Sequence, residues 1–381
     1  MASIAIAFLS FAIVLVYGSA NSLSLRNQQT GGLMYFALAL FVASLGFEAS
    51  IFPFNVLLPD VYQGSAGYAT AMLGGLNKKV GLAALMQVLI LIFIAFHLAF
   101  TIVAVLAVLT MFYGNLVALV QNNLKRLFAY SSISQAGYIL IGIAVATQSG
   151  IGASIFQIFA HAFLFIGAMG IVAWLESKDR NEINDVIGLY KENRFAAAAL
   201  TIFMLAFVGL PFTTGFIGKF LIFLSAVNTG LVWLALFGII NSVISIFYYA
   251  KVMTAMYTAK LGSYHTKIDN YTLAVVTVCL AVTLVFGSYP QPMLQAVNGA
   301  AAHLFNVASS AAVNSTTNST PGTLITTSIA TSTVPSALPT TITSTLNTST
   351  TSLTTSLNTT SQSTTTLNAT TTQLIGIGIR S

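Results

Sequence analysis

Charged residues are scarce in this chain. Of its 381 residues only 6% are charged, with 14 Lys and Arg against 8 Asp and Glu and a formal net charge of +6. Soluble domains carry about 25% charged residues, so this composition excludes an ordinary soluble protein. The few charges cluster between apolar runs and form no basic face, which leaves nucleic-acid binding without support.

Cysteine is almost absent. Cys279 is the only one, which excludes a disulfide framework, a thiolate metal cluster and an iron–sulfur centre within this chain. The sequence contains no Ser/His/Asp set and no metal-ligand spacing. The stretch from Gly215 to Lys219 also lacks the strand, the full glycine spacing and the Ser/Thr of a P-loop. No pattern in the sequence predicts a catalytic or metal site, so we expect any redox chemistry to take place in other chains.

Hydrophobic residues make up 56% of the chain, and the mean hydropathy is +0.87. An apolar run of about 20 residues is long enough to cross a bilayer as a helix. We predict an all-α polytopic membrane protein with about nine transmembrane helices, two of them broken. These segments lie near residues 3–20, 32–57, 68–92, 98–120, 127–148, 151–175, 195–227, 229–257 and 271–289.

The basic residues of the loops indicate an orientation. They fall in alternate loops, at Lys125 and Arg126, between Lys178 and Arg194, and between Lys251 and Lys267, with Arg26 as the exception. Basic loops are cytoplasmic by the positive-inside rule. The rule places the N-terminus in the cytoplasm and residues from 290 onward outside, in a multi-pass protein of the plasma membrane.

The first segment has a second interpretation. Residues 3–17 followed by Gly-Ser-Ala resemble the apolar core and cleavage site of a signal peptide. The positively charged start of such peptides is missing, so we favour a retained helix.

The C-terminal part has a different composition. A short apolar stretch to Val307 could lie along the outer surface, and beyond it Thr and Ser dominate. We predict two domains, a transmembrane domain at 1–308 and a disordered extracytoplasmic tail at 309–381. The tail carries five Asn-x-Ser/Thr patterns, which are glycosylation acceptors or chance matches in a Thr-rich segment. They begin at Asn314, Asn318, Asn347, Asn358 and Asn368.

Two of the apolar segments should be broken. In the seventh, Gly209, Pro211 and Gly215 interrupt the helix, because proline removes a backbone donor and clashes with the preceding turn. In the second, Pro53 has the same effect. The freed backbone groups must contact protein or a water-filled cavity rather than lipid.

Ionisable residues accompany these breaks. Lys219 follows the later break and Glu48 precedes the earlier one, while Lys78 and Lys79 lie in the third segment and His161 in the sixth. Adjacent helical residues point about 100° apart, so we expect only one of the two lysines to face Glu48. Groups of these types can exchange protons when desolvated. A packing kink with a snorkelling lysine, and a histidine that serves only in packing, are the alternatives.

Several motifs occur in the order known from one family. The sequence resembles the antiporter-like subunit N of NADH:quinone oxidoreductase, respiratory complex I, over residues 1–305, and shares its Lys-Arg-x-x-Ala-Tyr-Ser-Ser stretch with Mrp antiporters and membrane hydrogenases. The motifs are Leu58 to Gly64, Gly114 to Leu119, Asn123 to Ile133, Ala136 to Tyr138, Gly209 to Phe220, and Asn241-Ser242 with Ser245 and Tyr248-Tyr249.

The resemblance implies a fold of fourteen helices with two inverted five-helix repeats, each holding a broken helix. Residue 1 matches the start of the sixth helix, so about five helices are missing, while the second repeat at 98–257 is complete. Lys219 and Lys78 fall on family lysines. Glu48 and Asn55 depart from the family's lysine and histidine. Either Glu48 pairs with Lys78 and replaces the missing glutamate of the fifth helix, or this half-channel is inactive.

Three functions remain open. The resemblance implies a membrane-arm subunit that moves protons while partner subunits use NADH or another donor and quinone, with no cofactor in this chain. The second is an Mrp-type cation/proton antiporter subunit without a redox partner. The third is a non-conducting membrane anchor. Other membrane-arm subunits are the expected partners, together with a separate chain that supplies the first five helices.

Overall fold

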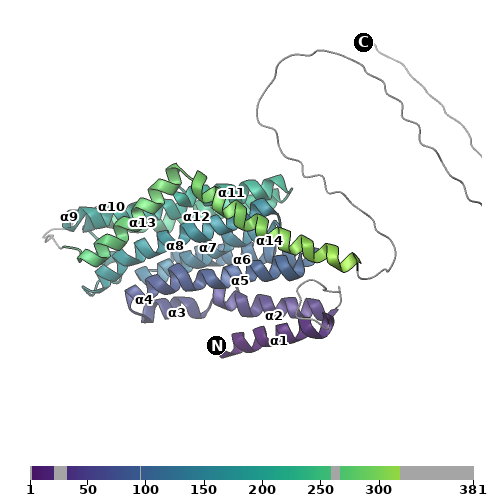
Figure 1. The fold of residues 1–381 in the computed structure, drawn as a ribbon. Coiled ribbons are helices and arrows are strands. Elements are labelled where there is room, and N and C mark those ends of the chain that lie inside the picture. The colour runs from purple at the N-terminus through teal and green to yellow at the C-terminus, as the bar shows by residue number, and fades with distance from the viewer. Residues whose placement is uncertain (1, 21–31, 95, 259–266, 318–381) are drawn as a thin grey trace, which may run out of the picture. The chain divides into compact units, whose positions relative to one another are not determined.

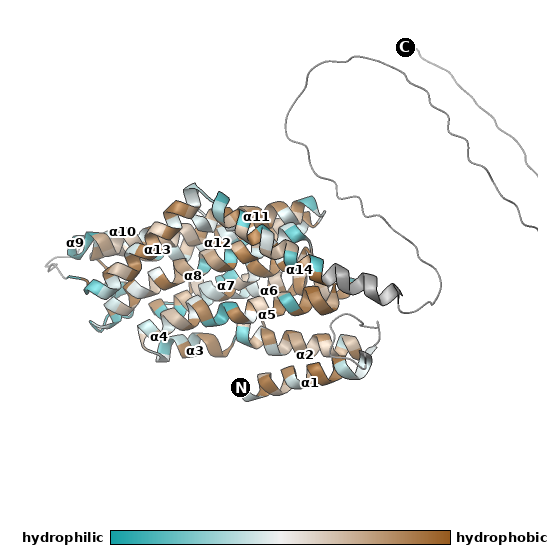
Figure 2. Cartoon of the chain, in the orientation of Figure 1, coloured by the Kyte–Doolittle hydropathy of each residue, from teal (hydrophilic) through white to brown (hydrophobic). Residues whose placement is uncertain are grey.

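The protein is built from helices. The computed structural model describes residues 2–20, 32–94, 96–258 and 267–317, and each regular element of these ranges is helical (Figure 1). Seven stretches of the described residues are long and apolar enough to cross a membrane, and apolar residues occupy most of the helices (Figure 2). The prediction of an all-α, multi-pass membrane protein is therefore confirmed.

The seven long stretches are α2 (Gly32–Ala49), the continuous α4 (Gly67–Met72), η1 (Leu73–Asn77) and α5 (Lys78–Phe93), α6 (His97–Leu119), α7 (Leu124–Ala144), α8 (Gln148–Glu176), α12 (Val232–Tyr257) and α13 (Asn270–Ser288). Shorter apolar stretches lie in α1 (Ala2–Ala20), α10 (Arg194–Val208) and α11 (Thr214–Asn228). The remaining helices are α3 (Leu57–Gly64), η2 (Ile183–Val186), α9 (Leu189–Glu192) and α14 (Gln291–Thr317).

Two gaps interrupt the helical path. The chain leaves α2 after Ala49 and re-enters a helix at Leu57, so Pro53 lies in the gap. It leaves α10 after Val208 and re-enters at Thr214, so Pro211 lies in the second gap. Each gap leaves terminal carbonyl groups without helical N–H partners.

The centre of the bundle is α7. Every residue of α7 except Arg126 is buried, and the helix packs against α6, α8, α3 and α11. The approach of α6 requires a small residue at position 114. A Cβ at Gly114 would lie 2.6 Å from the backbone nitrogen of Ser134, so only glycine allows this close helix packing.

The last described helix packs against the bundle. In α14, Val297 and Ala301 are buried, and the helix contacts α8 and α5. The expected surface segment up to Val307 is therefore partly a packed helix. The helix continues to Thr317, past the boundary predicted at residue 308, and contains Asn314. The other four predicted glycosylation sites lie outside the described residues.

Candidate functional site

The second helix break forms a binding site for the amine of Lys219. Lys219 lies in the second turn of α11 and is 4% exposed. Its Nζ donates to the carbonyl oxygens of Phe207 at 2.7 Å and Val208 at 3.1 Å, and to Ser242 Oγ at 3.3 Å. The same Nζ lies 4.3 Å from the ring centroid of Tyr138. Lys219 therefore does not snorkel, and its acceptors include the carbonyls that the end of α10 leaves free.

Glycine and threonine residues shape this break. Gly209 ends α10 with φ of 105°, in the left-handed region that favours glycine. Thr213 caps α11, since its side chain accepts from the backbone N–H of Phe216. A Cβ at Gly215 would lie 1.9 Å from the carbonyl oxygen of Ala206, so the two half-helices contact each other through a position that only glycine can occupy.

Two buried lysines begin α5. Lys78 is 3% exposed, and its Nζ donates to the carbonyl oxygen of Ser132 at 2.9 Å and to Ser132 Oγ at 3.3 Å. Lys79 is also buried, and its Nζ has no hydrogen-bond partner among the described residues. The two lysines follow the π-helical turn η1, an irregularity that frequently marks functional sites.

His161 is fully buried in α8. Both ring nitrogens lack a hydrogen-bond partner in the part of the chain that the structure describes. The ring stacks on Phe165, with centroids 5.7 Å apart, and lies 5.4 Å from the ring of Phe207. Aromatic packing therefore positions this histidine.

Two glutamines connect α8 to the Lys219 site. Gln157 Nε2 donates to Gln135 Oε1 at 3.3 Å, and Gln135 Nε2 donates to the carbonyl oxygen of Phe207 at 3.2 Å. Lys219 donates to that same carbonyl oxygen. Gln157 lies one helical turn before His161, so two buried amide groups connect this part of α8 to the carbonyl that Lys219 contacts.

The first break differs from the prediction. The side chain of Glu48 is exposed, and it accepts a hydrogen bond from Asn77 Nδ2 at 3.3 Å. None of the ion pairs among the described residues joins Glu48 to Lys78, so the predicted direct pair is wrong. The two residues instead line one cavity of about 230 Å³. The Lys78 amine donates instead to Ser132 of α7.

Comparison with known proteins identifies the family. The sequence profile of the family described as NADH:quinone oxidoreductase/Mrp antiporter, TM matches residues 1–245. The chain belongs to this family. NADH-quinone oxidoreductase subunit N 1 of Chloroherpeton thalassium is 35% identical over 299 residues, 75% of this chain and 62% of the relative. F(420)H(2) dehydrogenase subunit N of Methanosarcina mazei is 34% identical over 317 residues, 77% of this chain and 64% of the relative. The resemblance to subunit N is confirmed, and the protein is an antiporter-like membrane subunit.

Solved structures share the fold. A chain of respiratory complex I from Thermus thermophilus with bound aureothin aligns with a TM-score of 0.66 at 29% identity, over 78% of this chain and 66% of that chain. A chain of the Mrp complex from Dietzia sp. DQ12-45-1b aligns with a TM-score of 0.76 at 20% identity, over 81% of this chain and 67% of that chain. This antiporter-like chain spans less than two thirds of the length of the two relatives named above.

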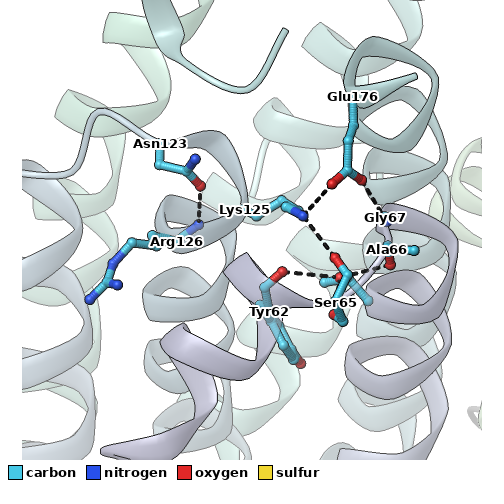
Figure 3. Close-up of polar contacts among 9 residues, drawn as sticks. Tyr62, Ser65, Ala66, Gly67, Asn123, Lys125, Arg126 and Glu176 are labelled. Atoms are coloured by element: carbon cyan, nitrogen blue, oxygen red, sulfur yellow. Dashed lines mark hydrogen bonds and ion pairs between the residues drawn. The ribbon is translucent and has the colours of Figure 1, made fainter. Parts of the chain in front are cut away.

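A partly buried ion pair connects three elements at one end of the antiporter-like bundle (Figure 3). Lys125 Nζ lies 2.5 Å from Glu176 Oε1 and also donates to the carbonyl oxygen of Ser65 at 2.8 Å. Glu176 Oε2 accepts from the backbone N–H of Gly67 at 2.6 Å. Lys125 is only 3% exposed. Lys125 was expected in a loop, whereas the structure places it in the first turn of α7, where it joins α7, α8 and the turn between α3 and α4.

Sequence reasoning missed several parts of the site. Ser132, Tyr138 and Ser242 lie in the quoted motifs, but no local pattern marks them, or Gln135 and Gln157, as parts of the site. The free carbonyls were the one available signal, because a broken helix must leave unpaired acceptors. Within the described residues no cluster of three His, Cys, Asp or Glu side chains could hold a metal ion.

Proposed function

We propose that this chain is a proton-translocating membrane-arm subunit of an NADH:quinone oxidoreductase-type complex. Partner subunits would pass electrons from NADH or another donor to quinone, and this chain would use that energy to move protons through Lys78, His161 and Lys219. The observation that carries the proposal is the coordination of the Lys219 amine by the carbonyls of the broken helix. A buried amine with such neighbours can bind and release a proton without contact with lipid.

The buried polar atoms support a hydrated route. A buried polar group without a partner costs about 1–3 kcal/mol, and ordered water usually supplies the missing hydrogen bonds. Unpartnered atoms of this kind occur at Lys79 Nζ, both nitrogens of His161 and Gln157 Oε1. We place water molecules at these atoms, where they would connect Lys78 to the Gln157–Gln135 link and so to Lys219. Glu48 would lie at the outer end of the cavity that it lines together with Lys78.

The wider arrangement follows from the same proposal. Residues 1–308 would form the transport domain, with the N-terminus in the cytoplasm and the Ser/Thr-rich segment at 309–381 outside the plasma membrane. Neighbouring membrane-arm subunits would transmit the energy of quinone reduction.

Reconstitution of the purified complex tests this function. We expect redox subunits that bind flavin or iron–sulfur clusters to co-purify with the full chain, and we expect donor oxidation by quinone to drive proton uptake into vesicles. Proton uptake that does not depend on quinone reduction would contradict the proposal.

The second candidate is an Mrp-type antiporter subunit, which the family description and the shared fold of the Dietzia Mrp chain favour. It predicts purification without redox subunits and proton movement driven by a sodium gradient. A non-conducting structural subunit predicts no effect of Lys219→Ala on proton movement in either assay.

A further inference from the structure

The outer face of α2 and α5 carries an acidic group. Glu48 is the penultimate residue of α2, and among the described residues its exposed carboxylate has one hydrogen-bond donor, the exposed amide of Asn77. A Cβ at Gly81 would lie 2.8 Å from Glu48 Cγ, so the Glu48 side chain lies across the turn from Asn77 to Gly81. None of the ion pairs found in the described ranges involves Glu48.

A membrane-spanning α4–α5 helix would hold this carboxylate at the depth of the lipid chains. Asn77 follows Gly67, the start of the continuous α4–α5 helix, by ten residues and precedes its end at Phe93 by sixteen. At 1.5 Å per residue these intervals are about 15 Å and about 24 Å. The hydrocarbon layer of a bilayer is about 30 Å thick, so a helix of this length places Asn77 and Glu48 within it. Lipid chains offer a carboxylate neither hydrogen bonds nor counter-charge.

The surroundings of Glu48 suit a transmembrane helix. Large apolar side chains are exposed around the Glu48–Asn77 contact, and the cavity lined by Glu48, Asn77 and Lys78 reaches the surface there. These apolar side chains are Val56, Leu57, Leu76 and Val80. Apolar surface around one acidic group is complementary to an apolar helix that carries one basic group.

We propose that a transmembrane helix of a partner polypeptide covers this face and places a lysine, arginine or histidine side chain against Glu48. The basic group would neutralise the carboxylate, and the apolar remainder of the helix would close the Lys78 cavity from lipid. The proposal rests on the geometry of Glu48 and does not depend on proton transport by this chain.

Site-specific crosslinking in the native membrane tests the occupant. The full chain, with a photoreactive amino acid at Leu76 or Val80, is irradiated in membranes of its own host. A matched control carries the same residue at Val278 of α13, which is exposed and apolar as well. We expect a protein adduct at positions 76 and 80 whose crosslinked peptide is an apolar segment with a basic residue near the site of attachment. Lipid adducts alone, a peptide of this same chain, or a peptide without a basic residue would each overturn the proposal.

Charge reversal tests the contact itself. Glu48→Lys should reduce recovery of the crosslinked partner at least fivefold on purification, and reversal of the partner's basic residue to glutamate should restore it. Asp60→Lys, another exposed acidic position, should leave recovery unchanged. Unchanged recovery with Glu48→Lys, or no restoration by the reversed pair, would contradict the inference. Unmutated protein that retains the crosslinked partner but moves no protons would count against the proposed function only.

Discussion

The Nζ atom of Lys219 lies 2.7 Å from the carbonyl oxygen of Phe207, the penultimate residue of α10. That carbonyl is available because α10 ends at Val208, and the lysine reaches it because α11 begins only at Thr214. The broken helix and the buried amine therefore form one structural unit. A change that restores a continuous helix should remove the amine's carbonyl acceptors. It should therefore disrupt the site as much as a substitution of Lys219 does.

The ring of Tyr138 should stabilise the charged amine. Tyr138→Leu removes an aromatic face 4.3 Å from Lys219 Nζ, an interaction worth about 0.5–2 kcal/mol. We expect a lower initial rate of proton uptake in proteoliposomes. Tyr138→Phe keeps the ring and loses only the hydroxyl that accepts from Ser242 at 3.2 Å, so its rate should remain near that of the wild type. An equal loss in both variants would assign the effect to the hydroxyl.

The contact between the half-helices should tolerate no side chain at position 215. Gly215→Ala places a Cβ against the backbone carbonyl of Ala206, and overpacking of this kind costs about 1–3 kcal/mol. We expect a lower thermal unfolding midpoint in detergent. The control is Gly299→Ala in α14, where a Cβ would have no neighbour within 4 Å and alanine favours the helix. A stable Gly215→Ala protein would show that the two half-helices do not depend on this contact.

The Lys125–Glu176 pair should matter more than the neighbouring exposed pair. Removal of one partner from a buried ion pair costs about 3–5 kcal/mol, and the 25% exposure of the Glu176 side chain reduces this figure. We expect Glu176→Gln to destabilise the protein by up to about 3 kcal/mol. Asp60→Asn breaks the exposed Arg126–Asp60 pair and should cost less than about 1 kcal/mol. Equal unfolding midpoints for the two variants would contradict this assignment.

The Asp269 cap of α13 should make a pH-dependent contribution to the stability of the folded protein. The carboxylate accepts from the backbone N–H of Thr272 at 2.9 Å, and this hydrogen bond lowers the pKa of Asp269 below its ordinary value of 3.8. The folded state therefore favours the charged form. The stabilisation is present above the ordinary pKa of 3.8 and is lost as the pH falls through the lowered pKa of the folded state. Asp269→Ala should cost about 0.5 kcal/mol at pH 7, at the low end for helix caps, because the site is exposed.

Unfolding midpoints measured from pH 7 to pH 3 check this prediction. The difference between the wild type and Asp269→Ala should narrow below about pH 4. Asp269→Asn keeps an uncharged cap, so its difference from Asp269→Ala should not change with pH. A wild-type difference that stays constant down to pH 3 would show that the charge of the carboxylate contributes nothing.

The residues that sequence reasoning found are those whose chemistry is local. Pro211 and Gly209 predict a break wherever they occur in a helix, and Lys219 is conspicuous in an apolar run. The long apolar segments predicted most helices for the same reason. Partners distant in the sequence could not be found in this way. The pairing of Lys125 with Glu176 and the amide bridge from Gln157 to Gln135 depend on which helices pack together, and no spacing along the chain encodes that packing.

Glu48 also shows that the sequence alone does not reveal which residue a side chain contacts. Its position before a break predicted a partner within the chain, and Lys78 was the nearest candidate. The orientation of α2 decides the outcome instead, because Gly81 lets the side chain cross α5 on its outer face, while Lys78 points to Ser132 on the inner face. Two residues can line one cavity and still have separate partners.

The central claim is that the buried amine at position 219 carries protons. The most direct test is the number of protons taken up per quinone reduced in proteoliposomes that contain the complex with Lys219→Ala. The matched control is Lys191→Ala, which removes an exposed lysine of α9. We predict that Lys219→Ala lowers this ratio while the assembled complex still reduces quinone, and that Lys191→Ala leaves it unchanged. An unaltered ratio in Lys219→Ala would contradict the claim.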